Sequence, residues 1–577
     1  MIFHKKFFYR IREKLNQDYK TITSGTNKII DENFFIIDSN NLEKIESKMY
    51  GFSVSKKGIL TDNYYKNIGR YEEPEPQGAF IMVRKIMNEI IIRQDYFGSY
   101  GLYIYENKNT EFFAISNSFL LLEEYLINKQ NMTLNKDFSD NLIISDLCTY
   151  SIQETLIKQI SIIPPNGYII INIKTKKFLI NYIDYKENSV PIESKKGMEI
   201  LDKWMDKWCY IIRSLKKQAN NFSTELSGGF DTRAILSIFL CSGIELNTIS
   251  IFSKKDNLHG HDEDFQIATN ISIKYGFKLN NLFFNTKSSK FSTRDSILLS
   301  MYTKLGFNKE LYFQTKFYEE PIFNFGGGGG ETIRGYPAEP IDKYIEIISS
   351  DKRQIKSNFQ RFFNSSVNLC NRSIELLNKL KKYDNNYQLA VDFYTKGFIK
   401  HHFGKSTVEN FLANKYIIQP LIDPDIKIIK FGISEKSYQD LYALILVRFA
   451  HDLISFPFQG KREINPDCIK KAEKLNNKSN PYKIKKDYNN NFYIDYIRTN
   501  SMKSSKNINN NIEEYLNNIF KTSEFRKSIN QLYNKDVYKI AKEYSIKSKF
   551  FRLKHFYGLF GIKKIYEDLK LNKKCKY

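Results

Sequence analysis

Short apolar runs separated by polar turns dominate the first third of the chain. The clearest runs lie at 79–83, 90–92, 102–105, 112–115 and 168–172. Short runs rich in β-branched and aromatic residues between polar turns are typical of strands. Residues 28 to about 185 are therefore predicted to form a β-rich domain of layered sheets with few helices.

The pattern changes after a polar stretch at about 188–196. Helical patterns then alternate with short apolar strands such as 247–252, which predicts a parallel α/β sheet with helices on both faces. Beyond about residue 476 the chain is rich in Asn and Lys, and a helical pattern resumes near residue 510. These changes predict three units, 1–190, 191–475 and 476–577, of which the last is an accessory helical extension.

A glycine-containing loop at 226–233 (Leu-Ser-Gly-Gly-Phe-Asp-Thr-Arg) joins a predicted strand at 222–226 to a predicted helix at 232–242. Two glycines let the backbone turn tightly, so that several N–H groups and the helix N-terminus approach one phosphate. Ser227 and Thr232 add hydroxyl donors, and Asp231 suits a Mg²⁺ ion held against the phosphates. The pattern predicts a pyrophosphate-binding loop. The alternative is a Ser-Gly-Gly turn in which the Asp caps the helix.

A second glycine-rich loop, Phe-Gly-Gly-Gly-Gly-Gly-Glu at 325–331, follows a strand-like run at 321–324. In a parallel sheet both loops leave the carboxyl ends of strands, where ligands bind. Two such loops, each followed by an acid, suit one Mg-nucleotide between them; the alternative is a glycine hinge that binds nothing. No Gly-Lys-Ser/Thr follows either loop, and Glu331 stands where a dinucleotide fingerprint has its third glycine. Kinase-type and dehydrogenase-type functions are therefore disfavoured.

Composition bounds the remaining classes. Hydrophobic residues make up 42% of 577 residues, which is enough for real cores. The net charge of +24 admits a nucleic-acid or anionic-membrane partner. However, Lys, Asn and Ile are abundant throughout, so we expect neither nucleic-acid binding nor membrane association. The six cysteines contain no CxxC pair, and the basic start lacks a signal-peptide core. We therefore expect a cytoplasmic protein without structural zinc. By residue type alone, His259 to Asp264 could ligate a metal.

The order of these elements resembles the asparagine synthetase family. It runs strand, Ser-Gly-Gly-x-Asp, strand, and then glycine-rich loop with Glu-x-x-x-Gly-Tyr at 331–336. The resemblance covers about residues 50–470, and Ser227 to Asp231 is its most specific part. The other matching positions are Gly78, 93–98 (Arg-Gln-Asp-Tyr-Phe-Gly), 102–103 (Leu-Tyr), Ser116, Thr155, 164–167 (Pro-Pro-Asn-Gly), 419–423 (Gln-Pro-Leu-Ile-Asp) and 457–461 (Pro-Phe-Gln-Gly-Lys).

The resemblance implies a fold in two main parts. Residues 1–190 would be a degenerate glutamine amidotransferase-like domain with the layered sheets of Ntn hydrolases. Residues 191–475 would be a PP-loop synthetase domain of the adenine nucleotide alpha hydrolase-like type, with a parallel sheet and a helical C-terminal part.

The resemblance also implies site residues for ATP and Mg²⁺. Backbone groups at Glu225 and Ile251 would bind adenine, and Phe325 and Gly326 would lie along the ribose. Lys461 would stabilise charge that develops as an acyl-adenylate is attacked; the alternative is a solvated surface lysine. Glu331 would be the second metal ligand and a catalytic residue. Pyrophosphate and Mg²⁺ would be held by Ser227, Gly228, Gly229, Asp231 and Thr232.

Several positions depart from the family pattern. Glutamine-using members carry a nucleophilic cysteine directly after the initiator Met, where this chain has Ile2. Gly330 stands where an Asp is expected, and Gly327 stands where acid–base side chains occur. Tyr416 and Ile418 replace a Glu and an Arg. These changes predict no glutamine hydrolysis by that route, and a distinct substrate or weakened activity.

The expected function is an ATP-dependent, AMP-forming amide ligase. It would adenylate a carboxylate on a small molecule or peptide and transfer it to an amine or ammonia. One alternative is a non-catalytic nucleotide-binding or assembly protein with an eroded metal site. Another is asparagine synthesis from free ammonia, which the changes at Gly327, Tyr416 and Ile418 disfavour.

Overall fold

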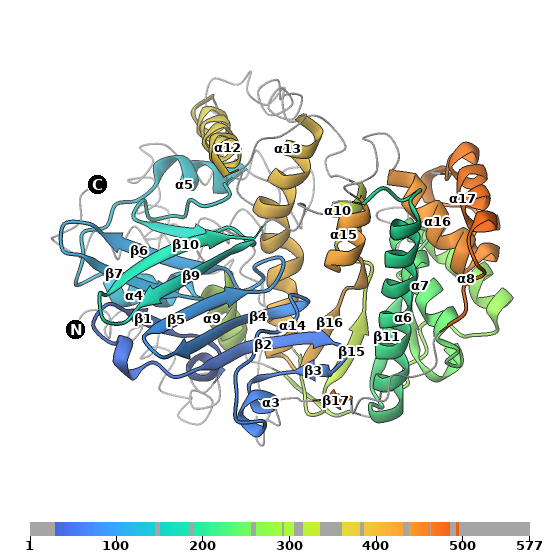
Figure 1. Cartoon of the computed structure of the whole chain (residues 1–577), viewed down its shortest axis with the longest axis horizontal. Coiled ribbons are helices and arrows are strands. Elements are labelled where there is room, and N and C mark those ends of the chain that lie inside the picture. Colours follow the sequence, from blue (N-terminus) through green and yellow to red (C-terminus); the bar gives the residue numbers. More distant parts are fainter. Residues whose placement is uncertain are drawn as a thin grey trace.

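The computed structural model of the chain describes residues 29–144, 151–183, 190–255, 261–284, 286–290, 293–304, 316–334, 360–380, 386–430, 438–461, 463–484 and 492–494. These residues form a mixed α/β structure. Layered antiparallel strands lie at one end and a parallel sheet with its helices lies at the other (Figure 1). No helix among them is long and apolar enough to span a membrane.

Antiparallel pairing dominates the N-terminal third. Its strands are β1 (Ile36–Asp38), β2 (Lys48–Ser55), β3 (Gly58–Leu60), β4 (Gly78–Ile86), β5 (Glu89–Gln94), β6 (Leu102–Asn107), β7 (Phe112–Ser116), β8 (Ile160–Ile163), β9 (Gly167–Asn172) and β10 (Lys177–Tyr182). One sheet has the order β1-β7-β6-β8, and the other runs β10-β9-β5-β4-β2-β3. The structure therefore has strands at all five of the clearest predicted runs. Burial alternates along β5 and β9, as expected where one face of a strand meets the core.

The parallel sheet has the strand order β12-β11-β15-β16. Its strands are β11 (Phe222–Glu225), β12 (Ser250–Phe252), β15 (Ile322–Phe325) and β16 (Lys415–Ile418). All three neighbouring pairs are parallel, which confirms the parallel sheet predicted from the alternation of helical and strand patterns. A further antiparallel pair joins β13 (Ser288–Lys290) to β14 (Lys316–Tyr318). Because β12, β11 and β15 are neighbouring parallel strands, the segments that follow them leave the same edge of the sheet.

Helices surround both groups of strands. In the N-terminal third they are α3 (Asp62–Asn67), α4 (Phe119–Leu126) and α5 (Lys136–Ile144). The later α-helices are α6 (Lys195–Gln218), α7 (Phe230–Ser242), α8 (His261–Tyr275), α9 (Thr293–Lys304), α10 (Gly330–Arg334), α12 (Gln360–Leu380), α13 (Asn386–Phe393), α14 (Lys405–Leu412), α15 (Pro424–Lys430), α16 (Tyr438–Phe449) and α17 (Pro466–Lys478). Short 3₁₀ segments include η6 (Pro420–Ile422), η7 (His451–Ser455) and η8 (Gln459–Lys461).

Helix α7 is bounded by glycines at both ends. Gly229 is its N-cap, and Gly243 ends it in the left-handed conformation with φ of 71°. Such a glycine is a common helix terminator because it carries no Cβ. The predicted helix at 232–242 is confirmed, and it begins two residues earlier than the apolar pattern indicated.

Helix α6 carries two fully buried tryptophans that hold the segment after β16. The indole N–H of Trp204 donates to the Pro420 carbonyl over 3.1 Å, and that of Trp208 donates to Asp423 Oδ2 over 3.0 Å. Lys207 pairs with the same aspartate. These contacts position η6, which follows the carboxyl end of β16.

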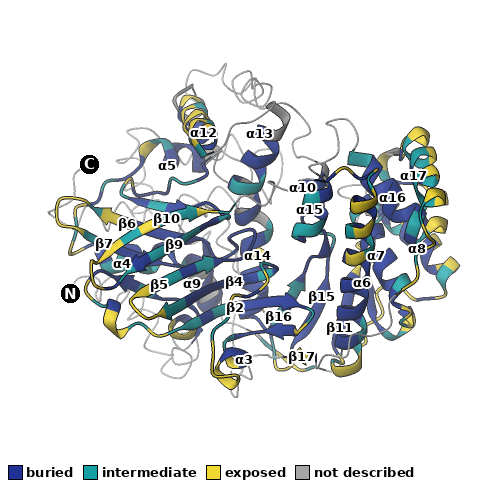
Figure 2. Ribbon diagram, viewed as in Figure 1, coloured by how far each residue is buried: buried dark blue, intermediate teal, exposed yellow. Residues whose placement is uncertain are grey.

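Aromatic packing joins the N-terminal sheets to the parallel sheet. The Phe52 ring, from β2, lies 5.5 Å from the Phe411 ring and 5.0 Å from the Tyr416 ring, measured between centroids. A continuous buried region runs from β2 through β16 to β15 (Figure 2). At its edge, the Gln77 side-chain amide donates to the Gln419 carbonyl over 2.9 Å. The two groups of strands therefore share one hydrophobic core.

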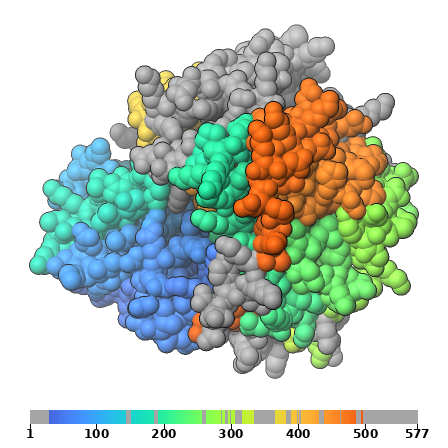
Figure 3. All heavy atoms as spheres, turned by 45° about the vertical axis from the view of Figure 1, so that its right-hand side comes forward, coloured from blue at the N-terminus to red at the C-terminus, as the bar shows by residue number. Residues whose placement is uncertain are grey.

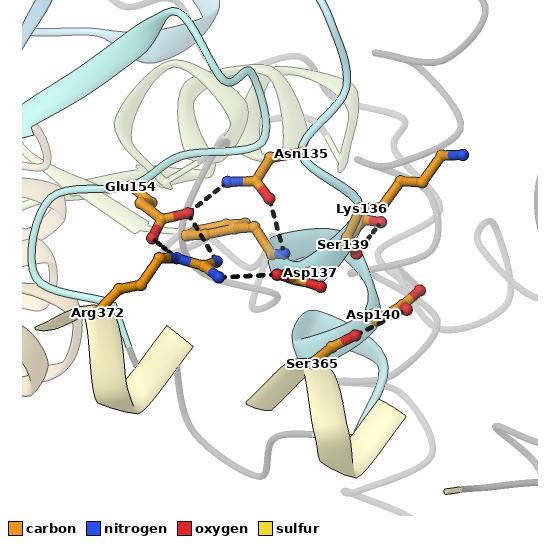
Figure 4. Close-up of polar contacts among 9 residues, drawn as sticks. Asn135, Lys136, Asp137, Ser139, Asp140, Glu154, Ser365 and Arg372 are labelled. Atoms are coloured by element: carbon orange, nitrogen blue, oxygen red, sulfur yellow. Dashed lines mark hydrogen bonds and ion pairs between the residues drawn. The ribbon is translucent and has the colours of Figure 1, made fainter. Parts of the chain in front are cut away.

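Polar contacts attach α12 to the N-terminal third as well. The Arg372 guanidinium donates to Glu154 and to Asp137 Oδ2, the latter over 2.9 Å (Figure 4). The Asn135 side-chain amide donates to Glu154 Oε2 over 2.7 Å, and the Ser365 hydroxyl donates to Asp140 on α5. A helix from the second half of the chain is thereby fixed across α5.

The segment after α17 returns across α6. Tyr482 donates to Asp206 Oδ1 over 2.9 Å, and Figure 3 shows these late residues packed against α6. Strand β17 (Tyr493–Ile494) then pairs in parallel with β3 in the N-terminal sheet. The predicted extension 476–577 lies mostly outside the described residues.

We predict that Phe52→Ala lowers the free energy of unfolding by about 3–5 kcal/mol, because it opens a cavity in the shared core. Urea unfolding would measure the change. The control is Leu179→Ala on β10, where the side chain is 59% exposed and the expected change is within about 0.5 kcal/mol. Equal effects of the two substitutions would contradict the role of this contact.

Candidate active site at the carboxyl edge of the parallel sheet

The first glycine loop is closed by its own hydroxyl groups. The Ser227 N–H donates to Thr232 Oγ1 over 3.1 Å, and the two hydroxyl oxygens lie 3.0 Å apart. The Gly229 N–H donates to Ser227 Oγ over 3.2 Å. These bonds hold the loop in a turn that leads directly into α7.

Acidic residues in the first turn of α8 fasten two segments of the site. The Gly228 N–H donates to the buried Asp264 Oδ1 over 2.7 Å, and the Gly460 N–H donates to Glu263 Oε2 over 3.0 Å. Both acids belong to the stretch that residue types alone allowed as a metal site. Among the described residues, no group of three or more His, Cys, Asp or Glu side chains could hold a metal ion. His259 lies outside the described residues.

Arg233 connects the first loop to the segment that bears the predicted lysine. Its fully buried guanidinium donates to the carbonyls of Leu453 (3.0 Å) and Phe456 (2.9 Å), and also to those of Pro457 and Gly228. Burial lowers the pKa of Arg233 to about 10, so the group is still charged at neutral pH. The predicted loop and the predicted lysine segment therefore form one packed unit.

Two further contacts strengthen this unit. The Gln459 N–H donates to the Gly228 carbonyl over 3.3 Å. The Phe458 ring lies between Phe230, with centroids 4.6 Å apart, and the Arg233 guanidinium, 3.7 Å from the ring centroid. Lys461 ends η8 within this segment, and its side chain lies outside the described residues.

The second glycine loop meets the first at Asp231. A Cβ at Gly327 would lie 2.9 Å from the Asp231 Cβ, and a Cβ at Gly330 would overlap the Asp231 carboxylate. On the other side of the loop, a Cβ at Gly328 would lie 2.5 Å from Gln419 Nε2, and one at Gly329 would overlap Ile422. Glycine is favoured at 327, where a Cβ would also lie 3.1 Å from the Asp231 backbone carbon, and at 329, where φ is 85°. At Gly328 and Gly330 the neighbouring atoms are the ends of the Gln419 and Asp231 side chains, which would have to shift.

Two glycines of the predicted nucleotide site are less crowded, since a Cβ at either would make only ordinary van der Waals contacts. The heavy atom nearest to a Cβ at Gly229 would be 3.4 Å away, and at Gly326 it would be 3.9 Å away. Gly229 also has no side chain with which to cap α7, so ligand oxygens can approach the first-turn N–H groups. The arrangement fits an anionic ligand that lies close to the backbone of both loops.

The remaining predicted nucleotide-contact residues lie on β11, β12 and β15. Glu225 ends β11 opposite Phe252 and its side chain is exposed. Ile251 is buried, and its carbonyl accepts the Asn280 N–H over 2.8 Å. The Phe325 ring is buried against Phe222, with centroids 5.2 Å apart, so the ring belongs to the core.

Glu331 is the second residue of α10 and is half-buried. It directly follows Gly330, the residue packed against Asp231. The structure therefore gathers 227–232, 326–331 and 457–461 at one edge of the parallel sheet.

Tyr416 and Ile418, which depart from the family pattern, are core residues. Tyr416 is fully buried among Phe52, Phe323 and Phe411. Ile418 pairs with Phe325, and its carbonyl accepts the Gly326 N–H over 2.9 Å. Next to Ile418 lies a small cavity between the two groups of strands. Its lining includes Gln77, Phe97, Ser99, Thr407, Gln419 and Ile422.

Sequence reasoning missed the contributions of Arg233, Asp264 and Tyr442. Arg233 gave a usable signal, since a charged residue stands inside an otherwise apolar helix. Asp264 was noticed only as one of several acids. Tyr442 gave none, because nothing in its local pattern distinguishes it from other aromatic residues of α16.

No protein-family model matches the chain, and no curated protein matches it either.

We predict that Arg233→Met lowers the free energy of unfolding by about 2–4 kcal/mol, because it removes charged hydrogen bonds to buried carbonyls. Hydrogen exchange should also become faster at the backbone amides of Phe456 and of 458–460. The control is Arg70→Met, where the side chain is 74% exposed and little change is expected. Unchanged exchange at Phe456 and at 458–460 would contradict the proposed connection.

Proposed function

We propose that the protein is an ATP-dependent, AMP-forming amide ligase that resembles the asparagine synthetase family. One observation carries this proposal. Two glycine loops from adjacent parallel strands meet at Asp231, and the segment that bears Lys461 is hydrogen-bonded to the first loop. We include in the proposal a degenerate amidotransferase-like fold for the N-terminal third and a PP-loop fold for the parallel sheet.

The proposed reaction has two steps. A carboxylate oxygen of the substrate attacks the α-phosphorus of ATP, and the bond to the bridging oxygen breaks to release pyrophosphate. An amine nitrogen then attacks the acyl carbon, the acyl–oxygen bond breaks, AMP leaves, and the amine proton passes to solvent. The identity of the acid and the amine is open.

The roles of the protein groups follow from their positions. The first-turn N–H groups of α7 and the hydroxyls of Ser227 and Thr232 would hold phosphate oxygens. Gly229 and Gly326 would let the ligand approach the backbone closely. Lys461 would stabilise negative charge at the reacting centre, a role that suits a point charge.

The residues present fit a magnesium ion that is shared with phosphates. Mg²⁺ is commonly bound by one or two carboxylates together with substrate phosphates and water. Asp231 lies at the junction of the two loops, and Glu331 is in the first turn of α10. When bound, Mg²⁺ would neutralise phosphate charge.

A second candidate function is nucleotide binding without catalysis. It is favoured by Gly330, which removes the acid expected there, and by the hydrogen bond that Asp231 accepts from Tyr442. In this alternative ATP binds at the same edge of the sheet but is not cleaved.

The test is incubation of purified protein with ATP, Mg²⁺ and pools of carboxylates and amines. We expect AMP and pyrophosphate to appear only when a substrate is present. Asp231→Asn should reduce their formation on the order of 100-fold, whereas Asp467→Asn, at an exposed position on α17, should not.

The outcomes separate the two candidates. ATP-dependent thermal stabilisation without any AMP across broad substrate pools would favour the binding protein. If neither AMP formation nor ATP-dependent stabilisation is detected, both candidate functions are excluded.

A further inference from the structure

Tyr442 places its hydroxyl at the junction of the two glycine loops. It lies on α16 and is fully buried. The hydroxyl donates to Asp231 Oδ1 and lies 3.5 Å from the Gly330 carbonyl oxygen. Its ring packs on Phe230, with centroids 5.5 Å apart. The side chain is therefore held from both ends, by ring packing and by hydrogen bonding.

The space beside Gly330 is already filled. A Cβ at this position would overlap the Asp231 carboxylate, so no larger residue fits without moving Asp231. An acid here would also place a second negative charge against the first. The Asp231 carboxylate occupies the volume that a side chain at 330 would need, and the Tyr442 hydroxyl donates to it there.

A hydrogen-bond donor is a different partner from a second acid. A hydroxyl that donates to a carboxylate orients it without adding charge. A cation bound at this carboxylate would be attracted by one carboxylate rather than by two. The phosphates of a nucleotide would therefore have to supply more of the electrostatic attraction.

We propose that Tyr442 is a positioning residue for a divalent cation bound together with a nucleotide. Its hydroxyl orients Asp231 at a junction where position 330 carries no acid. The inference rests on the proposed nucleotide site and adds how that site orients its metal ligand. It implies that the cation binds well only in the presence of nucleotide.

The first test uses Mn²⁺ and ATP as probes. Electron paramagnetic resonance would measure protein-bound Mn²⁺ with and without ATP in the wild type and in Tyr442→Phe. This substitution keeps the ring that packs on Phe230 and removes the hydroxyl. We expect Mn²⁺ affinity in the presence of ATP to fall about tenfold, as for loss of one hydrogen bond to a charged group. ATP affinity in EDTA should not change.

The matched control is Tyr438→Phe, one turn earlier on the same helix. It should leave Mn²⁺ affinity and thermal stability as in the wild type. A fall in ATP affinity in EDTA for Tyr442→Phe would indicate a merely structural role and overturn the proposal. Equal Mn²⁺ affinity in the wild type and Tyr442→Phe would overturn it as well.

Gly330→Asp provides a second, independent variant. If Tyr442 and Gly330 form a site for one aspartate, adding an acid should weaken Mn²⁺ binding in the presence of ATP. Tighter Mn²⁺ binding would show that the junction accepts two acids. The proposal that Tyr442 acts where a second acid is absent would then be wrong.

Failure of the proposed nucleotide site has a distinct signature. If the wild type binds ATP neither with Mn²⁺ nor in EDTA, both the nucleotide site and the inference that rests on it are wrong. If the wild type binds Mn²⁺ with ATP and Tyr442→Phe binds it equally, only the role of Tyr442 is wrong.

Discussion

The contact between Asp231 and the backbone of Gly327 and Gly330 sets the geometry of the whole site. Two loops from adjacent parallel strands can meet this closely only where no Cβ stands between them. The requirement extends to Gly328 and Gly329, which pack against η6 on the other side. Close packing of the loop therefore accounts for most of the five consecutive glycines. Within this run Gly326 is the least crowded, because a Cβ there would make only an ordinary van der Waals contact.

The buried Arg233 has a complementary role. A guanidinium removed from water is costly unless its donors find partners. Here backbone carbonyls from two parts of the chain accept from both terminal nitrogens of Arg233, while its Nε has no hydrogen-bond partner among the described residues. The same bonds that stabilise the charge tie the 453–457 segment to the first loop. Glu263 and Asp264 on α8 add bonds to Gly460 and Gly228 from another direction. The phosphate-sized loop and the lysine-bearing segment are thus positioned by protein contacts alone, before any ligand is considered.

The local part of this arrangement could be predicted from the sequence. Short apolar runs and glycine punctuation located β11, β12, β15 and α7, since these features act over a few residues. The long-range part could not be predicted. Tyr416 stands where the resemblance led us to expect an acid, and its ring fills a core shared with Phe52, more than 300 positions away. The carbonyl of Ile251, expected near adenine, accepts a bond from Asn280. Such pairings depend on tertiary packing, which one sequence does not display. The nucleotide and metal assignments remain predictions.

Position 330, where the resemblance led us to expect an acid, belongs to the same packed junction. A glycine that merely lacked a side chain would leave a gap beside Asp231. Instead, the carboxylate occupies that volume, a tyrosine hydroxyl contacts it, and the surrounding glycines are packed too closely to accept a Cβ. Because this volume is occupied, the junction has no gap in which a second acid could stand.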